Sequence, residues 1–130
     1  MRNGAVSKRV LVIDDDPVVR SLLSEYLTSR GHHVESIARS KVAMDHLQSG
    51  DSVMPDLIML DMIMPELSGL ELLRLIKGNP ICAQVPIVML SANSASETLA
   101  IIQHESITAD SYLQKPFDFK ALDQLIKGLD

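Results

Sequence analysis

Acidic side chains follow two short apolar runs of this chain. The run VLVI precedes Asp14, Asp15 and Asp16, and the run LIML precedes Asp61. Two carboxylates about 4 Å apart repel each other by roughly 4 kcal/mol at an effective dielectric constant near 20. A divalent cation offsets such repulsion and uses the carboxylate oxygens as ligands, as Mg²⁺ does. The acidic residues therefore predict a magnesium site if the two runs end side by side.

A basic and a hydroxyl side chain follow two further runs. Lys115 and Pro116 come after YLQ, and Ser91 comes after VPIVML. Short apolar runs of this kind predict buried strands, and a parallel α/β sheet binds its ligands at the carboxyl ends of its strands. Carboxylates, an ammonium group and a hydroxyl would then share one edge of the sheet.

Other polar residues are less informative. Asp16 fits a site residue and a helix cap equally well, whereas Asp56 precedes its apolar run and belongs to the opposite edge of the sheet. The four histidines fall in separate predicted segments, and we expect them on the surface. The single cysteine, Cys82, has no partner for an internal disulfide, which favours a structural role.

The composition indicates one soluble domain. The chain has 130 residues, 46% of them hydrophobic, which is enough for a single core. The net charge of −5 argues against direct nucleic-acid binding, because phosphates are neutralised by Lys and Arg. No apolar run approaches the ~20 residues that span a bilayer, and the first seven residues lack the apolar core of a signal peptide. We expect a cytoplasmic protein without membrane insertion.

Five predicted strands alternate with five predicted helices, an order that indicates an α/β fold with a mainly parallel sheet. In the first helix, helical spacing predicts a buried stripe of Val18, Val19, Leu22, Leu23, Tyr26 and Leu27. The second helix is marked by Val42, Ala43, Met44 and Leu47. The predicted strands are 9–13, 34–38, 56–60, 85–90 and 108–114; the helices start near Pro17, Ser40 as N-cap, Ser68, Ser96 and Ala121, with Gly31, Gly50 and Gly78 ending the first three.

The segments VLVIDDDP, LIMLDMIMPELSG, VPIVMLSA and SYLQKPF, in this order, resemble the response-regulator receiver domain of two-component signalling, of the chemotaxis-regulator type. The resemblance covers nearly the whole chain. It implies a flavodoxin-like (βα)5 three-layer sandwich whose five-stranded parallel sheet has the order 2-1-3-4-5. The receiver domain would occupy residues 8–130, after a flexible N-terminal extension of residues 1–7.

The same resemblance implies the role of each site residue. Asp61 would accept a phosphoryl group from a phosphohistidine on a histidine kinase or a histidine phosphotransfer protein. Mg²⁺ would be bound by Asp14, Asp15, Asp61 and the backbone carbonyl of Ile63. Lys115, followed by a cis peptide bond, would contact the phosphoryl group.

A switch is also implied. Ser91 would hydrogen-bond the phosphoryl group, and Tyr112 would change position with it. The surface of the fourth helix, fifth strand and fifth helix would then bind a downstream protein, a fused output domain or a second copy of the chain. Leu99 or Ile102 would add to that surface if exposed. Thr108 stands where many relatives have Gly, which puts the local turn in question.

Two alternatives share part of this pattern. A metal-dependent phosphatase also uses an Asp nucleophile and Mg²⁺, but Ile63 occupies the position of its usual second Asp. A flavodoxin-like FMN-binding protein has the same architecture, yet clustered aspartates would repel the cofactor phosphate. We therefore expect a signalling phosphoacceptor that assists its own phosphorylation and dephosphorylation, and not a turnover enzyme.

Overall fold

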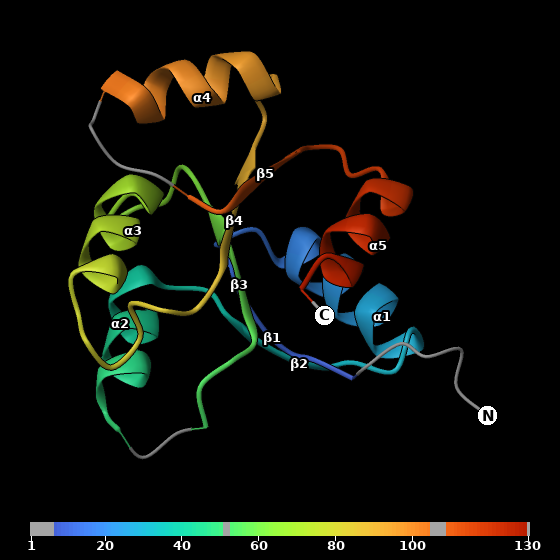
Figure 1. Cartoon of the computed structure of the whole chain (residues 1–130), viewed down its shortest axis with the longest axis horizontal. Helices are drawn as coiled ribbons and strands as arrows, with labels where there is room; N and C mark the ends of the chain where they lie inside the picture. Colours follow the sequence, from blue (N-terminus) through green and yellow to red (C-terminus); the bar gives the residue numbers. More distant parts are fainter. Residues whose placement is uncertain (1–6, 51–52, 105–108, 130) are drawn as a thin grey trace.

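A parallel five-stranded sheet lies between two layers of helices in the computed structural model, which describes residues 7–50, 53–104 and 109–129 (Figure 1). The strand order is β2-β1-β3-β4-β5, which confirms the predicted order. The elements are β1 (Arg9–Ile13), α1 (Pro17–Ser29), β2 (His33–Ile37), α2 (Ser40–Gln48), β3 (Leu57–Asp61), α3 (Gly69–Lys77), β4 (Ile87–Ser91), α4 (Ala95–His104), β5 (Ser111–Gln114) and α5 (Phe119–Lys127).

The sheet is apolar on both faces because helices cover both. Alternate residues of β1 enter different cores: Leu11 and Ile13 pack with α2, α3 and α4, whereas Val10 and Val12 pack with α1 and α5. Figure 1 shows α1 and α5 together on one side of the sheet and α2 and α3 on the other. Every residue of the inner strands β3 and β4 is buried, which accounts for apolar runs without alternation.

Side-chain caps begin two of the helices described next, and one predicted cap is wrong. Asp16 caps α1 by accepting a hydrogen bond from the Val18 backbone, and Ser68 forms a capping box with Glu71 at the start of α3. Ser40 was predicted to be the N-cap of α2, and this prediction is wrong. Arg39 occupies that position without a side-chain cap, because the Ser40 hydroxyl bonds to a neighbouring loop instead.

The apolar stripe predicted for α1 was too wide. Leu23 and Leu27 are fully buried, but Val18 is 71% exposed and Leu22 is 42% exposed. A helix that packs on a sheet presents only one stripe to it, and these two residues lie outside that stripe. The residue ranges of four strands also shift, so that Asp61 and Ser91 are the last residues of their strands. Thr108, the predicted start of the fifth strand, lies outside the described part of the chain.

Candidate functional site

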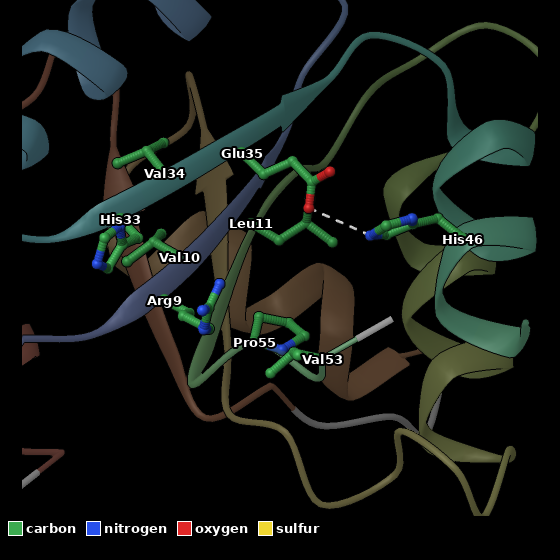
Figure 2. A pocket seen from close by; sticks show the side chains of 9 residues that line it. All are labelled: Arg9, Val10, Leu11, His33, Val34, Glu35, His46, Val53 and Pro55. Atoms are coloured by element: carbon green, nitrogen blue, oxygen red, sulfur yellow. Dashed lines mark ion pairs between the residues drawn. The ribbon is translucent and has the colours of Figure 1, made fainter. Parts of the chain in front are cut away.

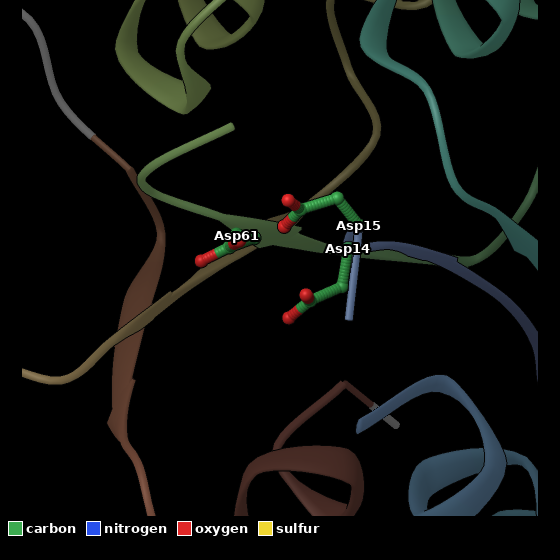
Figure 3. A group of neighbouring side chains, drawn as sticks. All are labelled: Asp14, Asp15 and Asp61. Carbon is green, nitrogen blue, oxygen red and sulfur yellow. The ribbon is translucent and has the colours of Figure 1, made fainter. Parts of the chain in front are cut away.

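Three carboxylates meet at the carboxyl edge of the sheet (Figure 3). Asp14 and Asp15 follow β1 and Asp61 ends β3, and one oxygen atom of each lies within 4.8 Å of the others. The parallel pairing of Ile13 with Leu60 produces this meeting, because the next residue of each strand is an aspartate. Asp14 is fully buried and Asp61 is 6% exposed, whereas Asp15 is open to solvent.

Lys115 reaches the same place from the end of β5. Its Nζ lies 2.9 Å from Asp14 Oδ2 and 3.2 Å from Asp61 Oδ1. Its backbone N–H donates to the carbonyl of Ser91 at 2.8 Å, which ties the lysine to the end of β4. The Lys115–Pro116 peptide bond is cis, as the resemblance to receiver domains implied. One ammonium group therefore faces a cluster of three carboxylates.

The charges in this cluster are incompletely balanced. Burial, followed by the charge of Asp14, raises the pKa of Asp61 from 3.8 to about 6, although Lys115 opposes the change. Burial alone would lower the pKa of Lys115, but its hydrogen bond and ion pair with Asp14, helped by Asp61, outweigh that effect and raise it. The lysine is therefore charged at neutral pH, and the site retains excess negative charge.

The donor set fits a hard divalent cation. Asp14 Oδ2 is buried, and its contact with Lys115 is the only one to a polar partner among the residues that the structure describes. Buried carboxylate oxygens normally have hydrogen-bond partners or bind metals. Several carboxylate oxygens converging at an edge open to water suit Mg²⁺, which binds a few carboxylates and retains part of its water shell.

Ser91 and Tyr112, the residues predicted to form a switch, lie on β4 and β5. Ser91 is buried, and its Oγ accepts a hydrogen bond from the Asn93 backbone at 3.0 Å. Tyr112 pairs in register with Met89, and its half-buried side chain packs against the core formed with α2, α3 and α4. Ser91 therefore ends β4 at the site, and Tyr112 lies on the neighbouring strand beside Met89, two residues before Ser91.

Ile63 and Asp16 flank the carboxylates. The Ile63 backbone N–H donates to Asp61 Oδ1 at 3.5 Å, while its side chain is 76% exposed. The structure places Asp16 as the cap of α1 and leaves it outside the three-carboxylate cluster. Asp56 lies at the opposite edge of the sheet, as predicted, where it accepts a hydrogen bond from the Arg9 backbone at 2.8 Å.

Gly69 is a site-supporting residue that the sequence analysis did not identify. Its backbone N–H donates to the carbonyl of Met62 at 2.9 Å, and a Cβ on this residue would overlap the carbonyl oxygen of Asp61. Gly69 directly follows Ser68, the predicted start of a helix, but that pattern carries no signal of the close approach to Asp61. Only glycine allows the first turn of α3 to pack this closely behind the acidic residue.

A second concavity is lined by the first residues of β1 and β2 (Figure 2), so it lies at the end of the sheet opposite to the carboxylates. It is open to solvent and has a volume of about 420 Å³, and an ion pair of 3.2 Å between Glu35 of β2 and His46 of α2 spans part of its wall. Its mixed lining includes Arg9, His33 and Val53. None of the acidic site residues borders it, so it is separate from the candidate site.

Comparisons with known proteins agree with this geometry. A model of the response regulator receiver domain matches residues 10–127. The response regulator MprA of Mycobacterium tuberculosis is 38% identical over 122 residues, and the phosphate regulon transcriptional regulatory protein PhoB of Pseudomonas aeruginosa is 32% identical over 124 residues. The matches cover 93% and 95% of this chain but 48% and 52% of those proteins, so the chain spans about half their length.

Two solved structures show the same fold. The chemotaxis response regulator CheY4 of Vibrio cholerae superimposes with a TM-score of 0.80 at 25% identity, covering 96% of this chain and 100% of that one. The receiver domain of the sensor histidine kinase PA1611 from Pseudomonas aeruginosa, which has magnesium coordinated in its active site cleft, gives 0.79 at 25% identity and covers 95% and 98%. With its acidic pocket and parallel sheet, the chain belongs to the response regulator receiver domain family.

Proposed function

We propose that Asp61 accepts a phosphoryl group from a phosphohistidine, in a Mg²⁺-dependent reaction, and that the domain thereby changes a protein-binding surface. One observation carries the proposal: a buried carboxylate at a strand end lies beside two further aspartates and in contact with a lysine ammonium. The donor would be a histidine kinase or a histidine phosphotransfer protein. Such a donor fits a receiver that acts in the cytoplasm. Among the described residues, none of the helices has the length and apolar character of a membrane span.

The proposed reaction is an attack by one Asp61 oxygen on phosphorus. Lys115 and the Ile63 N–H both contact Oδ1, which favours Oδ2 as the attacking atom. The new O–P bond forms as the N–P bond of phosphohistidine breaks. The electron pair of the N–P bond stays on the imidazole nitrogen, and the imidazole takes up a proton. Because a carboxylate is a weak nucleophile, the rate depends mainly on alignment and charge neutralisation.

Charge neutralisation comes from two sources. Mg²⁺ bound by Asp14, Asp15, Asp61 and the carbonyl of Ile63 would neutralise part of the charge on the phosphoryl oxygens. Lys115 lies 3.2 Å from Asp61 Oδ1, close enough to exchange a carboxylate contact for one to a phosphoryl oxygen. The same groups that assist transfer also surround the acyl phosphate, so we infer that the domain assists its own dephosphorylation.

Ser91 supplies the link to the switch. Its Oγ accepts the Asn93 N–H, and the hydroxyl hydrogen stays available to a phosphoryl oxygen. Phosphorylation adds about −1.5 to −2 charge, which favours a conformer in which Ser91 and Lys115 both contact the new group. Movement of Ser91 would change the packing of Tyr112, which lies on the neighbouring strand.

The output surface would include α4, β5 and α5. Ile102 belongs to the core, with 1% of its surface exposed, but Leu99 is 41% exposed and Ile101 is 38% exposed. Two exposed aliphatic residues on one helix favour a protein partner. The partner would be a downstream protein, an output domain fused to this one, or a second copy of the chain.

The test is the intact mass of the protein after incubation with acetyl phosphate and Mg²⁺. We expect one phosphoryl group on the wild type and none on Asp61→Asn or on wild type in EDTA, with Asp56→Asn as the matched control that labels normally. Labelling of Asp61→Asn at the wild-type level would refute the assignment. If the wild type is not labelled, failure of Mg²⁺ and beryllofluoride to bind would refute it as well, whereas binding would indicate that transfer requires a protein donor.

A further inference from the structure

The loop that joins β3 to α3, residues 62–68, contains one backbone conformation that needs support. Glu66 has a φ of 70°, in the left-handed region that side chains with a Cβ rarely adopt. Glycine would enter this region without a steric cost, but glutamate does so only where neighbouring contacts hold it. The same loop carries Ile63, two residues after the phosphoacceptor Asp61.

A single buried hydroxyl holds the peptide groups on both sides of Glu66. Ser40 Oγ donates to the carbonyl of Pro65 at 3.4 Å and accepts from the N–H of Leu67 at 3.1 Å. Ser40 is fully buried at the first position of α2, far from Glu66 in sequence. This explains why Ser40 is not a helix cap: its hydrogen-bonding capacity is used on the loop.

The side chain of Glu66 is held from the same place. Arg39 Nη2 lies 2.6 Å from Glu66 Oε2, and this hydrogen bond lowers the pKa of the Glu66 carboxyl group. Arg39 immediately precedes Ser40, so one dipeptide at the start of α2 contacts both the backbone and the side chain of the loop. At its other end the loop is closed by the hydrogen bond from the Gly69 N–H to the Met62 carbonyl.

We propose that Ser40, assisted by Arg39, is a positioning residue for the loop of residues 62–68 that follows the phosphoacceptor Asp61. By holding Glu66 in its left-handed conformation, Ser40 fixes the path of the backbone between Asp61 and Gly69, and so the place of the Ile63 carbonyl relative to the carboxylates. The inference rests on the proposed function, because it assigns the loop to Mg²⁺ binding. Ser40 touches neither the metal nor the phosphoryl group and acts only through the loop.

The test combines Mg²⁺ titration by calorimetry with hydrogen exchange of the Leu67 amide measured by NMR in the absence of metal. Ser40→Ala removes both hydrogen bonds, and we expect the Leu67 amide to exchange about tenfold faster and Mg²⁺ to bind about five- to tenfold more weakly. Ser49→Ala, at the exposed opposite end of α2, is the matched control and should change neither quantity.

A double-mutant cycle separates positioning from a general structural role. In a Glu66→Gly background the left-handed conformation no longer needs support, so adding Ser40→Ala should weaken Mg²⁺ binding by less than about twofold. If Ser40→Ala fails to fold, Arg39→Ala takes its place, because the Arg39 side chain is 66% exposed and its loss leaves the core intact. We expect Arg39→Ala to weaken Mg²⁺ binding about twofold.

The outcomes distinguish the two proposals. A wild type that binds neither Mg²⁺ nor beryllofluoride overturns the proposed function and this inference with it. A wild type that binds both, with unchanged Mg²⁺ affinity in Ser40→Ala, overturns the inference alone, even if Leu67 exchanges faster. An equal loss of Mg²⁺ affinity on adding Ser40→Ala to the wild type and to Glu66→Gly also overturns it, because Ser40 would then act independently of the left-handed residue.

Discussion

Replacing Asp61 by Asn should stabilise the metal-free domain at neutral pH. Burial and the charge of Asp14 raise the pKa of Asp61 from 3.8 to about 6, so the folded protein binds this proton more tightly than the unfolded chain does. A pKa difference of that size lowers the free energy of unfolding by about 3 kcal/mol when Asp61 is ionised. Water at the open edge of the site screens part of this effect, and we expect Asp61→Asn to raise the free energy of unfolding by about 1–2 kcal/mol.

The pH dependence follows from the direction of that pKa change. Because the pKa is raised in the folded state, the stabilising contribution of the proton is present below about pH 4 and is lost as the pH rises through about 6. The wild type should therefore lose stability relative to Asp61→Asn between these values and show a constant difference above pH 7. Lys115 also contacts Asp14, at 2.9 Å in the wild type, so we expect the substitution not to leave the lysine unpaired.

The assay is urea unfolding followed by circular dichroism in EDTA at pH 4.5, 5.5 and 7.5. Asp45→Asn removes the same charge from an exposed position on α2 and serves as the control. Adding Mg²⁺ at pH 7.5 should stabilise the wild type more than Asp61→Asn, because a ligand that binds only the folded state raises its stability. A variant that is no more stable than the wild type at pH 7.5, or a difference that does not change with pH, would refute the reasoning.

Three further substitutions test separate parts of the site. Gly69→Ala should destabilise the domain in urea unfolding by about 2 kcal/mol or more, because a Cβ there overlaps the Asp61 carbonyl. Gly128→Ala is the control and should be tolerated. Equal destabilisation by the two substitutions would contradict this reasoning. Lys115→Ala should lower phosphoryl incorporation, measured by intact mass, at least about tenfold while Mg²⁺ still binds; normal incorporation would remove the lysine from the mechanism. Tyr112→Ala should weaken partner binding more than Mg²⁺ binding in calorimetry, and the reverse would make Tyr112 a support of the site.

Much of the fold follows from the sequence because a parallel sheet covered on both faces has a strong pattern. The apolar runs that became β1, β3 and β4 predicted buried strands, and the order of the strands came from the resemblance to receiver domains. Burial within α1 was predicted less well. Val18 and Leu22 have the composition of a core stripe, but their exposure depends on how the helix is oriented against the sheet, which the spacing alone does not define.

The site residues that could be predicted from the sequence are those that lie at or just after the end of a strand. Asp14, Asp61 and Lys115 all follow or end strands, so parallel pairing brings them together. Ser40 was misassigned because a serine before a helical run has the same local signature whether it caps the helix or bonds to a distant loop. Only the three-dimensional path of the residues 62–68 reveals the second role, since both of its hydrogen-bond partners are backbone groups.

The account depends most directly on which residue receives the phosphoryl group. After incubation with acetyl phosphate and Mg²⁺, borohydride reduction converts an aspartyl phosphate to homoserine, and peptide mass spectrometry locates the converted residue. We predict conversion at Asp61 alone, absent from the sample with EDTA. Conversion at Asp14, at Asp15 or at a carboxylate outside the cluster, with Asp61 unmodified, would contradict the central claim.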